Sequence, residues 1–268
     1  MVPAQEMKFE IADRVATITF DRPERMNAWT PIMEGELRRL LTAASEDDEI
    51  RAIVITGAGK GFCAGADMGR LSATASGSTA APTPVVVPDS DEDFEQRYGY
   101  LLAVPKPLIA AINGSVAGVG LCIALYCDLR FMAAGAKLTT SFARRGLIAE
   151  HGSAWMLRHL IGPMNAADLL LSGRVLETTE AERLGLVRML PAENFREAVQ
   201  QKASEFANLC SPRSMRIIKQ QLALAPRQTL AEATQLANRE VALCRETEDF
   251  REGVAHFVEK RAPRFTGK

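Results

Sequence analysis

Apolar and polar residues follow two different spacings near the start of the chain. Residues 15–23, VATITFDRP, alternate with the two-residue period of a strand and end at a proline. Residues 27–50 are predicted to contain a helix, with Thr30 as its N-cap and Pro31 at its first position. A strand followed by a helix is therefore expected here.

Two later segments are apolar without interruption. Residues 51–59, RAIVITGAG, and 107–120, PLIAAINGSVAGVG, are typical of strands covered on both faces, and the second runs into a glycine-rich turn. Residues 121–134, LCIALYCDLRFMAA, then predict a helix and a third strand. This order indicates right-handed crossovers around a buried sheet, that is, an α/β fold.

The character of the chain changes at about residue 195, after which the pattern is helical throughout. We therefore predict an α/β core over residues 1–194 and a C-terminal helical segment over 195–268. A length of 268 residues suits one large domain with an appendage. Hydrophobic residues make up 47% and charged residues 24%, so a sizeable core can be buried.

The charges nearly cancel, with 32 Lys and Arg against 33 Asp and Glu. This balance argues against partners such as nucleic acid or an anionic membrane. Five cysteines without close pairing and three scattered histidines favour neither a disulfide framework nor a metal site. With no segment typical of a signal peptide or a membrane span, we expect a cytoplasmic protein.

One stretch, residues 72–94, is rich in Ser, Ala, Thr and Pro and lacks clear periodicity. It is typical of a flexible surface loop. It also suits a mobile lid over a pocket, and the two interpretations are compatible.

Two glycine-rich stretches follow predicted strands: residues 59–69, GKGFCAGADMG, and 113–128, NGSVAGVGLCIALYCD. Small residues let a ligand approach the backbone closely. The second stretch opens a helix, whose first N–H groups lack helical partners and attract negative charge. Two such loops can aim two N–H groups at one oxygen, as in an oxyanion hole. For either stretch alone, tight packing of strand against helix is the favoured interpretation.

Several motifs in order resemble the crotonase, or enoyl-CoA hydratase/isomerase, family. They are RPERMNA, AIVITGAGKGFCAGADM, KPLIAAINGSVAGVG, CDLRFMAAGAKLTTSFARRGLIAEHG, LLLSGRVLETTEAERLGLV and REGVAHFVEKRAPRF. The resemblance runs from about residue 8 to residue 265. It implies a spiral of strand–strand–helix units and a C-terminal helical part that packs across subunits, in homotrimers or in hexamers of two trimers.

The chemistry that the resemblance implies is stabilisation of a thioester enolate. By position, the N–H groups of Ala66 and Val119 receive the thioester oxygen. The implied substrate is an acyl-CoA thioester, with no separate cofactor and no metal.

The resemblance also implies further positions that contact substrate or CoA. These are Asn27, Ala28, Ala64, Gly65, Asp67, Gly118, Phe142 and Lys260. Asp67 is expected to fix its loop rather than perform chemistry. Lys260 matches a segment near the CoA phosphates, often those of the neighbouring subunit, although it equally suits a solvated basic face.

Two positions depart from the hydratases of this family, which use two glutamates to activate water. Those positions hold Cys122 and Phe142, neither of which transfers a proton as a glutamate does. A cysteine on an apolar helix is expected to be a small core residue. A standard two-glutamate hydration is therefore not expected.

Glu150, in GLIAEHG, matches the acid found in several double-bond isomerases of the family. Isomerisation needs one base that removes a proton from one carbon and returns it two carbons away. Apolar neighbours such as Phe142 would raise the pKa of this acid. The alternative is a helix-start acid near Gly152, and we favour the catalytic role. His151 then contacts substrate or is merely packed, and Trp155 belongs to the pocket wall or the core.

Three functions are weighed from these residues. The first is an acyl-CoA enzyme with Glu150 as acid and base, with isomerisation favoured over hydration by a rearranged site, thioester hydrolysis or carbon–carbon cleavage. The second is a CoA-thioester binder without catalysis. The third is an RNA binder, against which the balanced charge argues.

Overall fold

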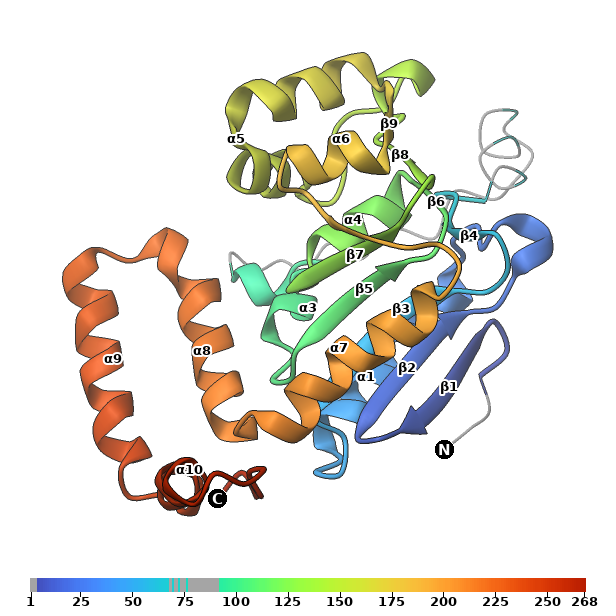
Figure 1. Ribbon diagram of the computed structural model, residues 1–268. Coiled ribbons are helices and arrows are strands. Elements are labelled where there is room, and N and C mark those ends of the chain that lie inside the picture. Colours follow the sequence, from blue (N-terminus) through green and yellow to red (C-terminus); the bar gives the residue numbers. More distant parts are fainter. Residues whose placement is uncertain (1–3, 68, 70–71, 73–75, 77–91) are drawn as a thin grey trace.

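The computed structural model describes residues 4–67, 69, 72, 76 and 92–268 (Figure 1). Most of the predicted loop or lid, residues 72–94, lies outside the described residues.

A six-stranded sheet forms the centre of the molecule, in the order β1-β2-β3-β5-β7-β10. β1 is antiparallel to β2, and the other neighbours are parallel. The three strands expected from the apolar pattern are confirmed as β3, β5 and β7. The bounds are β1 Met7–Ala12, β2 Val15–Phe20, β3 Ala52–Gly57, β5 Leu108–Ile112, β7 Leu129–Ala133 and β10 Arg188–Leu190.

A second sheet contains four short strands in the order β4-β6-β8-β9. Their bounds are β4 Gly61–Cys63, β6 Ser115–Ala117, β8 Lys137–Thr139 and β9 Val175–Glu177. The chain passes from β3 into β4, from β5 into β6 and from β7 into β8, so each strand of the central sheet is followed by one of the second sheet. Helices α4 (Val119–Leu125) and α5 (Ser153–Ser172) complete two of these units. The expected strand–strand–helix repeat is thereby confirmed.

Helix α1 begins as the sequence predicts. It spans Pro31–Glu46, and the Thr30 hydroxyl accepts a hydrogen bond from the Met33 N–H at 3.1 Å. The other helices of this region are α3 (Tyr100–Ala103), α6 (Thr178–Arg183) and the 3-10 turns η1 (Pro23–Arg25), η2 (Asp93–Glu95) and η3 (Ala143–Arg145).

The hydrophobic core lies between the central sheet and its helices. Every residue of β3 and of β5 is buried, which explains their uninterrupted apolar runs. Phe20 packs edge-to-face against Trp29 and Phe62, with ring centroids 5.4 and 5.2 Å apart. Truncating such a buried ring to alanine typically costs about 3–5 kcal/mol.

The C-terminal part is helical, as predicted. It consists of α7 (Phe195–Leu209), α8 (Pro212–Leu224), η4 (Ala225–Arg227), α9 (Leu230–Cys244) and α10 (Glu248–Glu259). Helix α7 lies across the central sheet, whereas α8, α9 and α10 extend away from it (Figure 1). Buried Lys219 of α8 connects the two parts, because its ammonium lies 2.7 Å from the Asp128 carboxylate.

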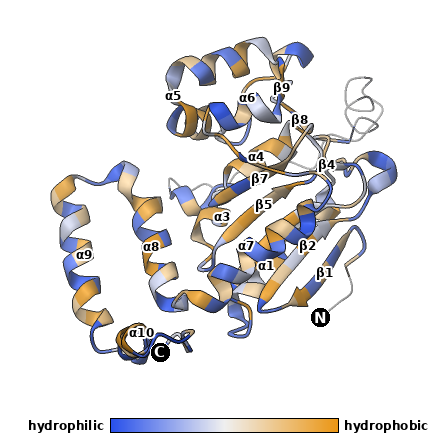
Figure 2. Cartoon of the chain, in the orientation of Figure 1, coloured by the Kyte–Doolittle hydropathy of each residue, from blue (hydrophilic) through white to orange (hydrophobic). Residues whose placement is uncertain are grey.

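Helices α8, α9 and α10 carry many hydrophobic residues, coloured orange in Figure 2, and expose several large apolar side chains. They are Ile218, Leu222, Leu230, Val241, Leu243, Phe250, Val254, Phe257 and Val258. Exposed sets of this size are typical of surfaces that contact another protein, a membrane or a ligand.

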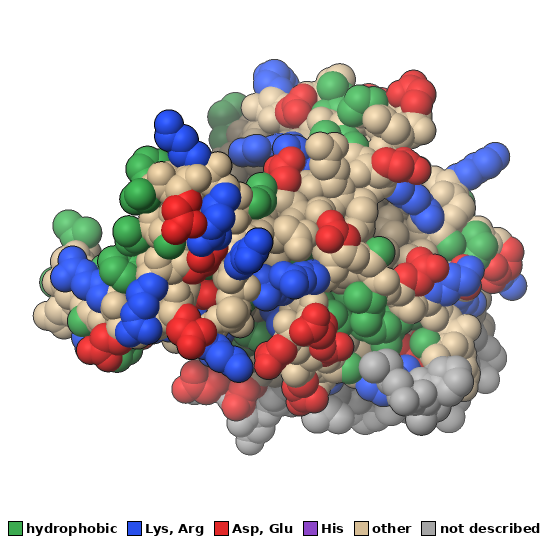
Figure 3. All heavy atoms as spheres, turned by 60° about the horizontal axis from the view of Figure 1, so that its bottom comes forward, with side chains coloured by type: hydrophobic (Ala, Val, Ile, Leu, Met, Phe, Trp, Pro, Cys, Tyr) green, Lys and Arg blue, Asp and Glu red, His purple; other side chains and the backbone are tan. Residues whose placement is uncertain are grey.

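Charges of both signs are interspersed on the face seen in Figure 3. No helix in the described part of the chain is both long and apolar enough to cross a bilayer. The cytoplasmic location stays a prediction.

Candidate active site

The loop that carries Ala66 is held by a parallel bridge to Trp29. The Trp29 N–H donates to the Gly65 carbonyl at 2.8 Å, and the Asp67 N–H donates to the Trp29 carbonyl at 3.3 Å. Backbone groups of successive extended residues point to opposite sides. The bridge therefore leaves the Ala66 N–H on the side away from Trp29, and Ala66 itself is exposed.

Val119 is the first residue of α4, so its N–H has no partner within the helix. The preceding Gly118 has a positive φ of 50° and donates its own N–H to the Thr139 carbonyl at 3.3 Å. At Gly118 the chain changes direction between strand β6 and helix α4. The Val119 N–H is thus available to a ligand.

The two loops approach each other backbone to backbone at the glycines that precede these donors. Gly65 has φ of +95°, and a Cβ there would lie 3.3 Å from the Ala117 carbonyl oxygen. A Cβ on Gly118 would lie 3.6 Å from the Gly65 Cα. A Cβ on Gly65 would crowd the Ala117 carbonyl, and the positive φ of both residues favours glycine.

A cavity of about 170 Å³ lies at this junction, and it brings Ala66, Val119 and Glu150 together. Its remaining lining is Trp29, Arg97, Gly118, Ser141, Phe142, Arg145, Leu147 and His151. Of these described residues, Glu150 is the only carboxylic acid. The cavity therefore combines two candidate N–H donors with a single candidate carboxylate base, beside the imidazole of His151.

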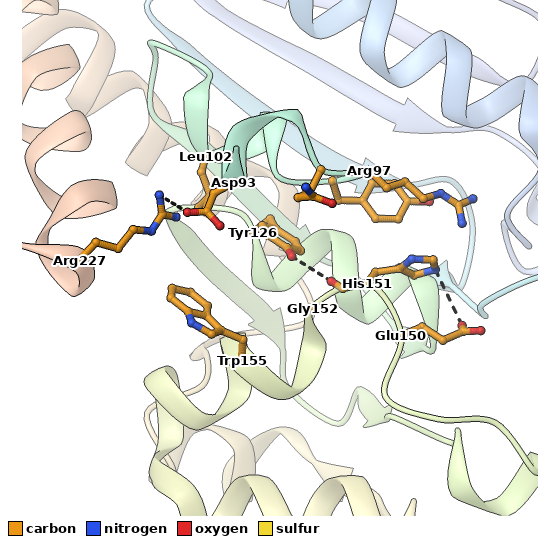
Figure 4. A pocket seen from close by; sticks show the side chains of 11 residues that line it. Asp93, Arg97, Leu102, Tyr126, Glu150, His151, Gly152, Trp155 and Arg227 are labelled. Atoms are coloured by element: carbon orange, nitrogen blue, oxygen red, sulfur yellow. Dashed lines mark hydrogen bonds and ion pairs between the residues drawn. The ribbon is translucent and has the colours of Figure 1, made fainter. Parts of the chain in front are cut away.

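A larger cavity of about 560 Å³ adjoins the smaller one and shares Arg97, Glu150 and His151 with it. Figure 4 shows Glu150 and His151 at one end of this larger cavity and the Asp93–Arg227 ion pair at the other. Its lining is completed by Gln96, Tyr98, Leu102, Tyr126, Gly152 and Trp155.

Glu150 lies in the turn between η3 and α5, three residues before the helix begins. The N-cap of α5 is Gly152, and no side chain caps this helix end. The Glu150 carboxylate is half-buried at the junction of the two cavities instead. Glu150 therefore does not cap α5 through its side chain, and its catalytic role stays a prediction.

The surroundings of Glu150 act on its proton affinity in two directions. Burial raises the pKa of Glu150 above its ordinary value of 4.5, and the positive charge of Arg97 opposes this rise. Burial, followed by the charge of Arg97, lowers the pKa of His151 to about 4. His151 is therefore neutral at neutral pH, and the approach of its Nε2 to the Glu150 carboxylate at 3.8 Å is not an ion pair.

Sequence reasoning missed Arg97, which lines both cavities. Its Nε and Nη2 donate to the two carboxylate oxygens of Glu34 at 2.8 and 2.5 Å. Burial would raise the pKa of Glu34, but the hydrogen bonds and charge of Arg97 lower it, so the pair is ionised. The only signal in the sequence is one basic residue after a low-complexity stretch, and it does not identify a site.

His151 and Trp155 both line the larger cavity. The Tyr126 hydroxyl donates to the His151 carbonyl at 2.9 Å, which fixes the turn beside Glu150. Trp155 is 44% exposed and lies on the His159 ring with centroids 4.0 Å apart. Trp155 is thus wall rather than core.

The two positions that hold glutamates in hydratases are apolar and buried here. Cys122 lies inside α4, and burial, with the charge of Glu150, raises the pKa of its thiol to about 12. The thiol is therefore protonated at neutral pH and is a poor nucleophile. Phe142 is buried next to Gly118 and forms an apolar wall of the smaller cavity.

Asn27, expected to contact CoA, uses its side chain within the protein. It is fully buried, and its amide nitrogen donates to the carbonyls of Ala58 and Gly61 at 2.9 and 2.8 Å. Its amide oxygen accepts from the Arg22 N–H at 2.9 Å. Asn27 therefore shapes the predicted CoA loop, and its own side chain is not free to meet a ligand.

Arg22 ties the predicted CoA loop to the loop of Ala66. Its guanidinium donates to the Ala28 carbonyl at 2.6 Å and lies 3.4 Å from the Asp67 carboxylate. The Ala64 N–H donates to the Met26 carbonyl at 3.0 Å. Asp67 thus holds its loop, as the sequence suggested.

Lys260 lies apart from these residues. It is exposed, directly follows α10 and lines neither cavity. Helix α10 lies at the bottom of Figure 1, beside the start of α8, where the Ser211 hydroxyl donates to Asp249 at 2.5 Å. A contact between Lys260 and CoA would need a second subunit and stays a prediction.

Comparisons with known proteins agree with this arrangement. Residues 10–268 match the family described as enoyl-CoA hydratase/isomerase. A relative named 1,2-epoxyphenylacetyl-CoA isomerase, from Escherichia coli (strain K12), is 34% identical over 255 residues, which cover 95% of each chain.

Solved structures give the same result. An enoyl-CoA hydratase from Polaromonas sp. JS666 has a TM-score of 0.87 at 28% identity, covering 97% of this chain and 99% of that one. An enoyl-CoA hydratase from Bacillus anthracis has a TM-score of 0.85 at 27% identity, covering 98% of this chain and 100% of that one. The chain therefore belongs to the enoyl-CoA hydratase/isomerase family, and its fold is that of the crotonases.

Proposed function

We propose that the protein moves a carbon–carbon double bond in an acyl-CoA thioester, with Glu150 as the single acid and base. The observation that carries this proposal is that Glu150 is the only carboxylic acid among the described residues lining the cavity of Ala66 and Val119. One base and one oxyanion hole are sufficient for a proton shift through an enolate.

The proposed reaction balances without any other reactant. The Glu150 carboxylate removes a proton from the α carbon of a 3-enoyl thioester, and the electron pair moves toward the thioester oxygen. The N–H groups of Ala66 and Val119 stabilise this oxygen, each by ~3 kcal/mol in the transition state. Glu150 then returns the proton to the γ carbon, which gives the 2-enoyl thioester and restores the carboxylate.

The electrostatics of the cavity support this role. Half-burial raises the pKa of Glu150, which makes its carboxylate a stronger base than an exposed glutamate. Arg97, held by Glu34, opposes that rise and favours the ionised carboxylate. The apolar ring of Phe142 takes the place of a second acid.

Hydration by a rearranged site is the second candidate, because solved relatives are named enoyl-CoA hydratases. The hydratases of the family use a second acid in water addition, and Cys122 and Phe142 provide none here. Binding without catalysis is less favoured, because a base lines the N–H cavity, whereas thioester hydrolysis would use the same base and stays an alternative.

We further propose that the substrate brings the CoA, with no separate cofactor, and that subunits associate through the apolar side chains of α8, α9 and α10. A homotrimer, or a hexamer of two trimers, would place Lys260 near a neighbouring subunit's CoA. Light scattering of the purified protein measures this assembly directly.

The test of function compares two reactions of the same purified protein. Isomerisation of 3-enoyl-CoA to the conjugated 2-enoyl-CoA is followed by ultraviolet absorbance, and hydration is followed with crotonyl-CoA. We expect isomerisation to be the faster reaction by roughly 100-fold or more, the contribution expected of one general acid–base group. Faster hydration would contradict the proposal.

A further inference from the structure

An ion pair lies at the end of the larger cavity that is farthest from Glu150. Asp93, the first residue of η2, pairs with Arg227, the last residue of η4 (Figure 4). Both side chains line the cavity. The pair therefore joins the core to the C-terminal helices at the position where a bound acyl chain would end.

Arg227 has a second partner in η2, the turn that also holds Asp93. Its guanidinium lies over the Phe94 ring, 5.4 Å from the ring centre. This contact and the ion pair orient the guanidinium across the cavity end. The side chains of Arg227 and Asp93 remain 35% and 48% exposed, so the pair is solvated and contributes little to folding stability.

Between Glu150 and the Asp93–Arg227 pair, part of the cavity wall is apolar or aromatic. Tyr126, Trp155 and Leu102 present rings and an aliphatic side chain to the cavity (Figure 4). An acyl group that starts at Ala66 and Val119 and passes Glu150 would enter this region. An apolar tail long enough to reach Asp93 and Arg227 would strip water from two charged groups, which is unfavourable.

We infer that the Asp93–Arg227 pair is the outer stop of the acyl cavity and sets the longest acyl chain that the protein accepts. This inference rests on the proposed function, because it assumes an acyl group bound between Glu150 and the pair. It makes Asp93 and Arg227 specificity-determining residues. The turn between α8 and α9, which holds Arg227, then contributes to the choice of acyl-chain length.

The test uses the full chain and a series of straight-chain acyl-CoA esters of increasing length. The variant Asp93→Ala with Arg227→Ala removes both charges together, so no unpaired charge remains. A second variant, Asp93→Arg with Arg227→Asp, restores a pair with exchanged signs. The control, Lys202→Ala with Glu205→Ala, removes an exposed ion pair of α7 that lines neither cavity.

Two quantities are measured for each ester: kcat/KM with the 3-enoyl series and the dissociation constant with the saturated series. The Ala/Ala variant should gain roughly tenfold or more with the longest ester, the scale on which methylene groups are discriminated, and should change little with the shortest. The exchanged pair and the control should keep the length profile of the unmodified protein.

The outcomes separate the two proposals. If no 3-enoyl ester is turned over, the proposed isomerisation fails, and the dissociation constants still test the stop. If the Ala/Ala variant folds and its length profile equals that of the unmodified protein, the stop is overturned. A gain with the longest ester in the Lys202 and Glu205 control would overturn it as well.

Discussion

Gly65 and Gly118 pack so closely that a Cβ on Gly118 would lie 3.6 Å from the Gly65 Cα. Each glycine directly precedes one of the two candidate oxyanion donors, Ala66 and Val119. The spacing between the two N–H groups is therefore set by backbone-to-backbone contact between two loops, without any side chain between them.

Replacing Gly65 by alanine is expected to separate these donors. The residue has φ of +95°, and the new Cβ would lie 3.3 Å from the Ala117 carbonyl oxygen. Loss of one oxyanion donor lowers kcat by roughly 100-fold or more. Steady-state kinetics measure this loss, and Gly35→Ala, in an open position of α1, should leave kcat unchanged. Full activity of Gly65→Ala would contradict the oxyanion hole.

Cys122→Ala tests whether the buried thiol takes part in the reaction. Burial and the charge of Glu150 raise the pKa of Cys122 to about 12, so the thiolate is nearly absent at neutral pH. We expect kcat to change by less than about threefold, with a small loss of stability of about 1 kcal/mol from the lost volume. A large loss of kcat in a normally folded variant would assign chemistry to the thiol.

The pH dependence of kcat/KM follows from the raised pKa of Glu150. The base must be deprotonated, so activity is lost as the pH falls through that pKa, and the midpoint should lie above the ordinary 4.5. Arg97 opposes the rise, so removing its charge should move the acidic limb to higher pH.

The variant for this measurement is Arg97→Met combined with Glu34→Gln, because Arg97→Met alone would leave a half-buried Glu34 carboxylate unpaired. Glu34→Gln alone is the matched control, since it keeps the Arg97 charge. A limb that stays in place or moves to lower pH in the double variant would show that Arg97 does not act on the base.

Lys219→Met should weaken the connection between α8 and the core. The buried ammonium lies 2.7 Å from Asp128 and donates to the Lys106 carbonyl at 3.2 Å. Losing charged hydrogen bonds of this kind costs about 1–3 kcal/mol. Denaturant unfolding measures the loss, with Lys202→Met on the exposed face of α7 as the control. Equal stability of the two variants would contradict this role of Lys219.

The sequence predicts those parts of the fold that have local signals. Strands β3 and β5 are visible as apolar runs because both of their faces are covered, and α1 is visible because Thr30 and Pro31 mark its start. The strands of the second sheet have only three residues each, which is too short for a recognisable alternation.

The candidate site likewise contains residues that the sequence can identify and residues that only the folded structure brings in. Glu150, Ala66 and Val119 stand in motifs that can be recognised locally, and the structure lines one cavity with them. Arg97 and the Asp93–Arg227 pair belong to the site only through contacts between distant parts of the chain. Asn27 was expected to meet CoA, whereas its amide holds neighbouring backbone carbonyls, a role that depends on folded loops.

The most direct test of the central claim is the isomerisation rate of Glu150→Gln on a 3-enoyl-CoA ester that the unmodified protein accepts. The amide keeps the shape of the side chain and removes the base. We expect kcat to fall roughly 100-fold or more, with the affinity for the CoA ester nearly unchanged. If Glu150→Gln moves the double bond at the rate of the unmodified protein, Glu150 is not the acid and base, and the account is wrong.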